Sequence, residues 1–311
     1  MKYLISGFFL LFLSVVSVNA QTLSNIDFFA EGKKVIITYD LSDCEAGDYY
    51  DVTLTFVEQN TLKVTVPKTI SGDIKKITCG SKRIVWDIGA DVSSLSGRFY
   101  PELEVKKADK NTVTDIEGNS YKFVKIGTQF WMAENLKTAK YNDGTVIPNI
   151  TDNAQWSGLT TGAWCYYDNN VANNAKYGKL YNWYAVSKTT NGNKNVCPTG
   201  WHVPTDAEWN VLTDYLGGVD VAGGKLKEAG AINWKSPNTD ATNTSLFTGL
   251  PGGGRNYDGY YFFIGHYGGW WSSSESDTSL AWSRLLDYSS GYVDRDNGNM
   301  EDGFSVRCLR D

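Results

Sequence analysis

Tryptophan is distributed very unevenly along this chain, and its distribution divides the chain near residue 110. Of the 11 Trp, only Trp86 precedes that point. The segment before it contains short runs in which apolar and polar or β-branched residues alternate, at 34–39, 51–57, 62–66, 83–87 and 99–105. Short strands separated by turn clusters are typical of a small sandwich. We therefore predict an N-terminal all-β sandwich of immunoglobulin-like type over residues 21–106 and a linker over residues 107–112.

The second part of the chain, residues 113–311, is predicted to be α+β with much irregular structure. Residues 177–186 carry Leu180, Trp183 and Tyr184 at helical spacing, which predicts one helix there. A second helix is expected to begin at the capping box of residues 205–208 and to end at the glycines 217–218. A third, shorter helix is expected over residues 224–229.

The first twenty residues have the pattern of a secretory signal peptide. Lys2 precedes an apolar run over residues 4–18, and Ala20 stands at a small-residue cleavage position. The run is shorter than the roughly 20 apolar residues that span a bilayer, and no later stretch is apolar enough for a transmembrane segment. We expect a mature chain from Gln21 that is exported to the periplasm, the cell surface or the exterior.

Five cysteines in an exported chain indicate disulfides. Their spacing contains no CxxC pair, which argues against a zinc knuckle or a thioredoxin motif. Because each pair falls within one compositional half of the chain, we predict the bridges Cys44–Cys79 and Cys197–Cys308. Cys165 is then left over as a buried free thiol.

Charge and motifs exclude several functions. The net charge is −6 without a basic tract, which disfavours nucleic-acid binding. The sequence has no HExxH, GxSxG or P-loop pattern and only two histidines. No cofactor is indicated, and His202 is interpreted as a packed structural residue.

A series of motifs after residue 112 resembles the Fibrobacter succinogenes major paralogous domain. The motifs, in the order of that family, are GTQFWMAENL at 127–136, GAWCYYD at 162–168, YGKLYNWY at 177–184, CPTGWHVPT at 197–205, LPGG at 250–253, GWWSSSE at 269–275 and GFSVRCLRD at 303–311. The resemblance covers roughly residues 113–311. It implies a C-type-lectin-like fold akin to the formylglycine-generating and sulfatase-modifying group, in exported bacterial proteins, and it brings no established activity.

The enzymatic relatives implied by this resemblance differ from the chain at their key positions. Formylglycine-generating relatives use a reactive cysteine pair near the C-terminus, where this chain has only Cys308. Other relatives use a three-histidine iron site, which His202 and His266 cannot supply. The chain is therefore predicted not to be an enzyme.

An oxygen-rich segment near the C-terminus is a weak metal candidate, with Asp294, Asp296 and Asp302 as its carboxylates. An EF-hand loop would need its glycine one position later than Gly298, and the calcium motifs of true C-type lectins are absent. We interpret the segment as a solvated polar loop and predict no metal site.

The loops between residues 251 and 299 are the predicted binding surface, because Tyr, Ser, Asn and Gly dominate them. Tyr offers a large contact area at low entropic cost, and small polar residues offer adaptable hydrogen bonds. The leading contacts are expected to be Arg255, Tyr257, Tyr260, Tyr261 and Tyr292. Trp270, Trp271 and Trp282 are expected to be core residues instead.

The predicted function is an exported binding or adhesion protein that recognises a glycan or a surface protein. One alternative is a structural component of the cell envelope without a specific ligand. A formylglycine-generating type of enzyme is the third candidate.

Overall fold

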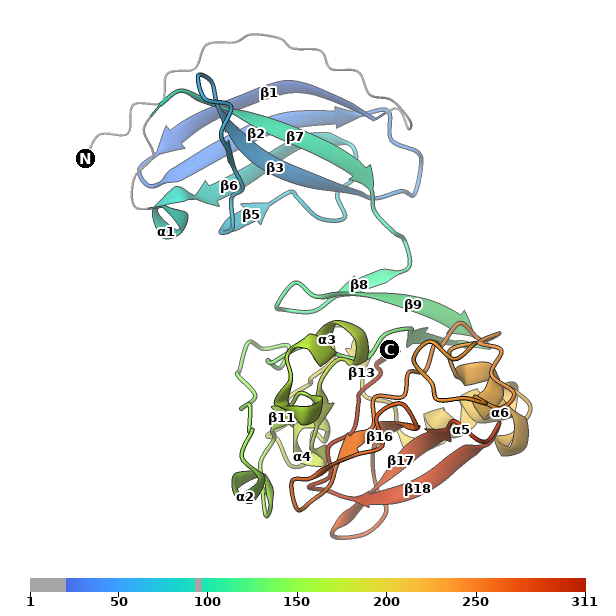
Figure 1. Cartoon of the computed structure of the whole chain (residues 1–311). Helices are drawn as coiled ribbons and strands as arrows, with labels where there is room; N and C mark the ends of the chain where they lie inside the picture. Colours follow the sequence, from blue (N-terminus) through green and yellow to red (C-terminus); the bar gives the residue numbers. More distant parts are fainter. Residues whose placement is uncertain (1–20, 93–96) are drawn as a thin grey trace. The chain divides into compact units, whose positions relative to one another are not determined.

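The computed structural model describes residues 21–92 and 97–311, which form two compact units (Figure 1). One unit ends at Lys110 and the other runs from Asn111 to Asp311. The predicted signal peptide lies outside the described residues. No helix in the described part of the chain has the length and apolar character needed to cross a membrane.

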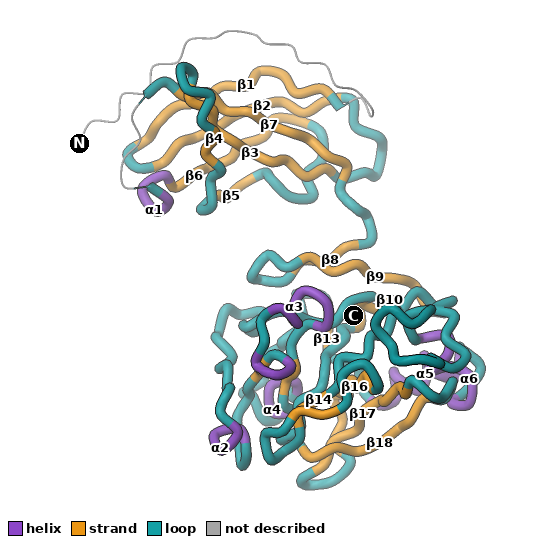
Figure 2. The backbone as a smooth tube through the Cα atoms, in the orientation of Figure 1, coloured by secondary structure: helices purple, strands orange, loops and turns teal. Residues whose placement is uncertain are grey.

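Two sheets build the first unit (Figure 2). One has the order β1-β2-β6-β5, with bounds Thr22–Glu31, Lys34–Ser42, Gly80–Asp87 and Ile70–Gly72. The other has the order β4-β3-β7, with bounds Val64–Thr65, Tyr50–Glu58 and Phe99–Lys107. The single-turn helix α1, Ile88–Asp91, follows β6.

Alternation places one face of each sheet in a common core. Val52, Leu54 and Phe56 of β3 are buried, as the pattern predicts, and they share a hydrophobic cluster with side chains of β2 and β6. Four of the five predicted strands are confirmed, and the one predicted over residues 62–66 is shorter, only Val64–Thr65. β1 and β5 were not predicted. β1 is a mostly exposed edge strand. Because few of its side chains are buried, apolar and polar residues do not alternate regularly along it. The disulfide Cys44–Cys79 is confirmed.

The second unit contains two larger sheets and two short strand pairs. The five-stranded sheet has the order β13-β19-β10-β9-β8, with bounds Trp201–His202, Leu309–Arg310, Gln129–Met132, Ser120–Ile126 and Thr112–Thr114. The three-stranded sheet runs β16-β17-β18, with bounds Tyr267–Glu275, Leu280–Asp287 and Val293–Asn299. The pairs are β11 with β12, Trp164–Cys165 and Leu180–Tyr181, and β14 with β15, Gly254–Arg255 and Tyr261–Phe262.

Short helices connect these strands. They are α2 Asn153–Trp156, α3 Ala172–Tyr177, α4 Trp183–Val186, α5 Asp206–Tyr215, α6 Val219–Leu226 and the 3-10 turn Tyr167–Asn169. The capping box at the start of α5 is confirmed, since Thr205 and Glu208 exchange side chain to backbone hydrogen bonds. Gly217 and Gly218, both with positive φ, follow its end as predicted.

The other two helix predictions need correction. Residues 177–186 do not form one helix, because Gly178 has φ +74° and a Cβ there would lie 2.6 Å from the carbonyl oxygen of Leu136. The chain instead leaves α3, forms β12 and restarts as α4, which the Asn182 side chain caps. The third helix begins at Val219 and ends at Leu226, several residues earlier than predicted.

Aromatic side chains fill the interior of the second unit. Trp270 and Trp271 are buried, as expected, whereas Trp282 is only half-buried. The predicted disulfide Cys197–Cys308 is present, and Cys165 is a buried free cysteine.

Buried cations hold the irregular segments of this unit together. Lys227 is fully buried, and its ammonium group donates to three backbone carbonyls, those of Thr239, Asp287 and Ser290. Arg307 is fully buried as well and binds Asn135 and three other carbonyls. Backbone carbonyls in loops and at strand ends are satisfied in this way, which burial requires.

His202 links the start of α5 to Asp311 through hydrogen bonds from both ring nitrogens. Its Nε2 lies 3.0 Å from Glu208 and its Nδ1 lies 2.6 Å from Asp311. The hydrogen bond to Glu208, together with that to Asp311, raises the pKa of His202 above 6.5 against the opposing effect of burial. Burial opposes ionisation of Glu208 too, but the bonds from His202 and Thr205 lower its pKa to about 2.

We expect the stability of the second unit to fall as the pH rises from 6 through the raised pKa of His202. A group whose pKa is higher in the folded than in the unfolded protein stabilises the fold at pH values below its unfolded pKa, which is 6.5 for His202. This stabilisation is lost as the pH rises through the folded pKa. Denaturant midpoints measured from pH 6 to 9 should therefore decline in the wild type and stay flatter in His202→Gln. Equal slopes for the two proteins would contradict this role for His202.

Candidate binding site

The hairpin formed by β14 and β15 holds four of the five predicted contact residues. Its tip is a tight turn in which the Asn256 amide donates to the carbonyl of Tyr260. Gly259 has φ +90°, and a Cβ there would lie 2.6 Å from Cα of Asn153 in α2. The tip is therefore packed closely against α2, and its conformation is set before any ligand arrives.

Arg255 is the anchor of this hairpin, which corrects the prediction that it contacts a ligand. The side chain is fully buried, and its guanidinium donates to the carbonyls of Gly259, Ile150 and Thr151. It also lies 4.4 Å from the ring of Trp156. Each of its three guanidinium nitrogens is engaged inside the protein, so this cation is not available to a ligand.

The tyrosines of the hairpin differ in exposure. Tyr257 and Tyr260 are 50% and 65% exposed. Tyr261 is half-buried, donates to Asn169 and packs on Tyr167. Tyr257 and Tyr260 are thus available for contact, whereas Tyr261 mainly supports the hairpin.

Tyr292 lies elsewhere on the unit. It is 39% exposed and belongs to the turn between β17 and β18, where Gly291 accepts a hydrogen bond from Gly224 of α6. Figure 1 shows α2 and α6 on opposite sides of the second unit. The five predicted contacts therefore do not form one surface.

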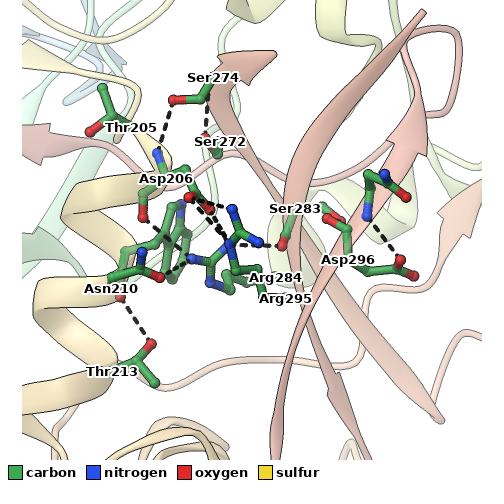
Figure 3. Close-up of polar contacts among 12 residues, drawn as sticks. Thr205, Asp206, Asn210, Thr213, Ser272, Ser274, Ser283, Arg284, Arg295 and Asp296 are labelled. Atoms are coloured by element: carbon green, nitrogen blue, oxygen red, sulfur yellow. Dashed lines mark hydrogen bonds and ion pairs between the residues drawn. The ribbon is translucent and has the colours of Figure 1, made fainter. Parts of the chain in front are cut away.

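The three-stranded sheet presents two faces of different character. Register and alternation place Trp270, Leu286 and Val293 on one face, where they join a hydrophobic core. Arg284 and Arg295 share this face, and both bind Asp206 of α5 (Figure 3). Burial alone would raise the pKa of Asp206, but the bonds from the two arginines keep it below its usual value.

The opposite face of the sheet forms the floor of a hollow of about 240 Å³. The β14–β15 hairpin and the segment 302–304 complete its walls. Its aromatic lining residues are Phe262, Phe263, Tyr267 and Phe304. Its polar lining residues are Ser283, Asp296, Asn297 and Asp302. Aromatic surfaces next to a few polar groups are the usual composition of a ligand site.

Phe263 is the residue of this hollow that the sequence did not reveal. Its side chain is 59% exposed, and its backbone has φ +56°. A bulky residue in the left-handed region is strained, and such strain clusters at functional sites. The run of aromatic residues at 260–263 within a polar segment was the only signal of it.

Asp302 joins the hollow to the hairpin. Its two carboxylate oxygens accept hydrogen bonds from the backbone amides of Tyr257 and Asn299. Burial raises the pKa of Asp302 to about 7 against these bonds, and the neighbouring Glu301 and Asp258 raise it further. The residue therefore positions Tyr257 and also places a carboxyl group in the hollow.

The three weak metal candidates do not form a cluster. Asp294 and Asp296 lie on the open face of β18, and Asp302 follows that strand. Burial raises the pKa of Asp294, as do the nearby Asp296 and Asp287. Within residues 21–92 and 97–311, no three His, Cys, Asp or Glu side chains are grouped as metal ligands.

Comparison with known proteins identifies the family of the second unit. A sequence model of the Fibrobacter succinogenes major domain matches residues 124–310, more than half of the chain. Comparison with curated proteins found no match, and comparison with solved structures found none. The C-type-lectin-like relation therefore stays a prediction, as does the immunoglobulin-like character of the first unit. By the extent of this match, the chain belongs to the Fibrobacter succinogenes major domain family.

Proposed function

We propose that this chain is an exported binding protein whose second unit recognises a glycan in the hollow beside the β14–β15 hairpin. The observation that carries the proposal is Phe263, a large apolar side chain held in solvent at the rim of a hollow by a strained backbone. Leu62 and Leu246 are also exposed with a left-handed backbone, so what distinguishes Phe263 is its place in the lining of the hollow.

The chemistry of the hollow favours a sugar. Phe263 and Tyr267 supply aromatic faces for the C–H surface of a sugar ring, while Asp296 and Asp302 supply oxygens for its hydroxyls. A volume of about 240 Å³ is below the roughly 300 to 1,000 Å³ of sites for drug-sized ligands. The hollow thus suits one sugar residue. Tyr257, which is half exposed and whose backbone amide donates to Asp302 of the hollow, is available for the next residue of a sugar chain.

The hairpin adds affinity because it is ordered beforehand. Arg255, Gly259 and Asp302 hold its backbone through buried contacts. Tyr side chains on a rigid backbone lose little conformational entropy when a ligand binds. The hollow and the exposed tyrosines favour binding over a structural envelope component, for which a flat charged surface would be expected.

A catalytic role has less support. Cys308 is engaged in a disulfide with Cys197, so it is not free to act as a nucleophile. Burial raises the pKa of the Cys165 thiol to about 11, against the lowering effect of Arg255, which keeps it protonated at neutral pH. We propose that the domain binds without catalysis. Export is proposed on the signal pattern of residues 1–20 and the two disulfides.

Phe263→Ala is expected to weaken glycan binding by about 2 kcal/mol, the loss typical of a central aromatic contact. Its thermal stability should change little, because the ring is mostly exposed. The mature chain from Gln21 would first be screened on a glycan array, and the best ligand then titrated calorimetrically against wild type and variant.

Leu246→Ala is the matched control. Leu246 is 60% exposed and also has a left-handed backbone, with φ +59°, but it does not line the hollow. Its replacement should leave affinity unchanged. Equal effects of the two substitutions would place the binding surface elsewhere.

A further inference from the structure

The hollow carries negative charge without a compensating cation. None of the described residues that line it is Lys, Arg or His. Asp296 and Asp302 both line it, and burial raises the pKa of Asp302 to about 7, so part of the Asp302 population is protonated at neutral pH. Register places Asp287 and Asp294 on the same face of the sheet, beside the hollow. The two arginines of this sheet point the other way, to Asp206.

The charged side chains around Asp302 are also acidic. Glu301 and Asp258 act on its carboxyl group, and both oppose its ionisation. Each carboxylate oxygen accepts a single backbone hydrogen bond, so each has a lone pair left for a ligand. A ligand cation placed here would relieve this repulsion, and a ligand anion would increase it.

The aromatic lining favours the same kind of ligand. Phe262, Phe263, Tyr267 and Phe304 line one hollow together with the two carboxylates. A cation within about 6 Å of an aromatic ring is attracted by the negative face of the ring. Carboxylates beside aromatic faces therefore form an environment for an ammonium group.

We infer that the hollow selects a sugar residue that carries a protonated primary amine, with Asp296 and Asp302 as its acceptors and the aromatic side chains around it. The inference rests on the proposed function and names the class of sugar. N-acetylated residues lack the charge, and uronic, sulfated or sialylated residues carry the opposite one. An amino sugar should thus bind better than all of these.

The test compares matched ligands on the mature chain by calorimetry at pH 7. Glucosamine, N-acetylglucosamine and glucose differ mainly in the amino group. Glucosamine should bind at least about tenfold more tightly than the other two, since hydrogen bonds between charged groups are roughly twice as strong as those between neutral groups. Butylamine and Nα-acetyl-lysine amide present the same ammonium group without a sugar ring, and they should bind more weakly than glucosamine.

Asp296→Asn is the informative variant, because it removes a charge at an exposed position while keeping the shape of the side chain. It should reduce the preference for glucosamine over glucose to within about threefold. Asp220→Asn in α6 removes the same charge from an exposed position outside the hollow, and it should preserve the preference.

The possible failures are distinguishable. If the three sugars bind equally and Phe263→Ala weakens all of them, the amine preference is wrong and the glycan function stands. If the ring-free amines bind as tightly as glucosamine and Asp296→Asn abolishes the binding of these amines, the ammonium site stands and the glycan assignment is wrong. If no ligand binds, both are overturned.

Discussion

Replacing Arg307 with Met should destabilise the second unit by roughly 4 kcal/mol or more. The guanidinium is fully buried and satisfies the side-chain oxygen of Asn135 and the carbonyls of Met132, Phe247 and Thr248. Methionine can donate to none of these oxygens. The Asn135 oxygen keeps the hydrogen bond from Trp270, whereas each buried backbone carbonyl left without a partner costs about 1 to 3 kcal/mol. Chemical denaturation followed by Trp fluorescence measures this directly, because only Trp86 lies outside the second unit.

Arg310→Met is the matched control for this prediction. Arg310 is exposed and lies 5.5 Å from the ring of Phe130. Its loss should change the unfolding free energy by about 0.5 kcal/mol or less, as is usual for surface positions. If the denaturation midpoints of Arg307→Met and Arg310→Met are the same, buried cations do not hold these loops together.

Removing the Cys197–Cys308 bridge is the second change with a large expected effect. The bridge joins residues 111 positions apart, and both sulfurs are buried. Closing a loop of this length lowers the entropy of the unfolded chain enough to contribute about 5 kcal/mol. The double variant Cys197→Ser, Cys308→Ser should therefore lose at least about a third of a typical stability of about 5 to 15 kcal/mol.

The other disulfide provides the comparison. Cys44 and Cys79 are 35 positions apart in the first unit. Replacing both with Ser should destabilise that unit by about 4 kcal/mol and leave the main Trp fluorescence transition in place. The expectation would be contradicted if the Cys44, Cys79 variant lost the main Trp transition while the Cys197, Cys308 variant kept it.

Local signals predicted much of this architecture. Alternation identified the strands of the first unit because each buries one face in a shared core. The capping box of α5 was predictable because its two hydrogen bonds involve neighbouring residues. Both disulfides were assigned from the division of the chain into two parts.

Features that depend on distant contacts were not predictable in this way. Residues 177–186 have helical spacing, yet the contact of Gly178 with Leu136 breaks the helix. Arg255 was interpreted as a ligand contact, since nothing in its neighbourhood shows that Ile150, Thr151 and Trp156 surround it.

The candidate site was predicted in part. The segment 251–299 does supply the hairpin and most of the lining of the hollow, and Tyr257 and Tyr260 are exposed as expected. The importance of Phe263 follows from its backbone conformation and its place at the hollow, which only the folded chain defines. Asp296 and Asp302 were considered as metal ligands, and the folded chain brings both into the lining of the hollow.

Mapping the bound ligand on the mature chain by amide NMR is the most direct test of the hollow as a binding site. The sugar with the highest affinity would be titrated into isotope-labelled protein, and amide shifts would be followed residue by residue. The account predicts that the largest shifts fall on Gly253, Phe263, Gly269, Gly298 and Asp302, which line the hollow. Shifts confined to the first unit, to α5 and α6, or to the turn at Tyr292 would contradict it.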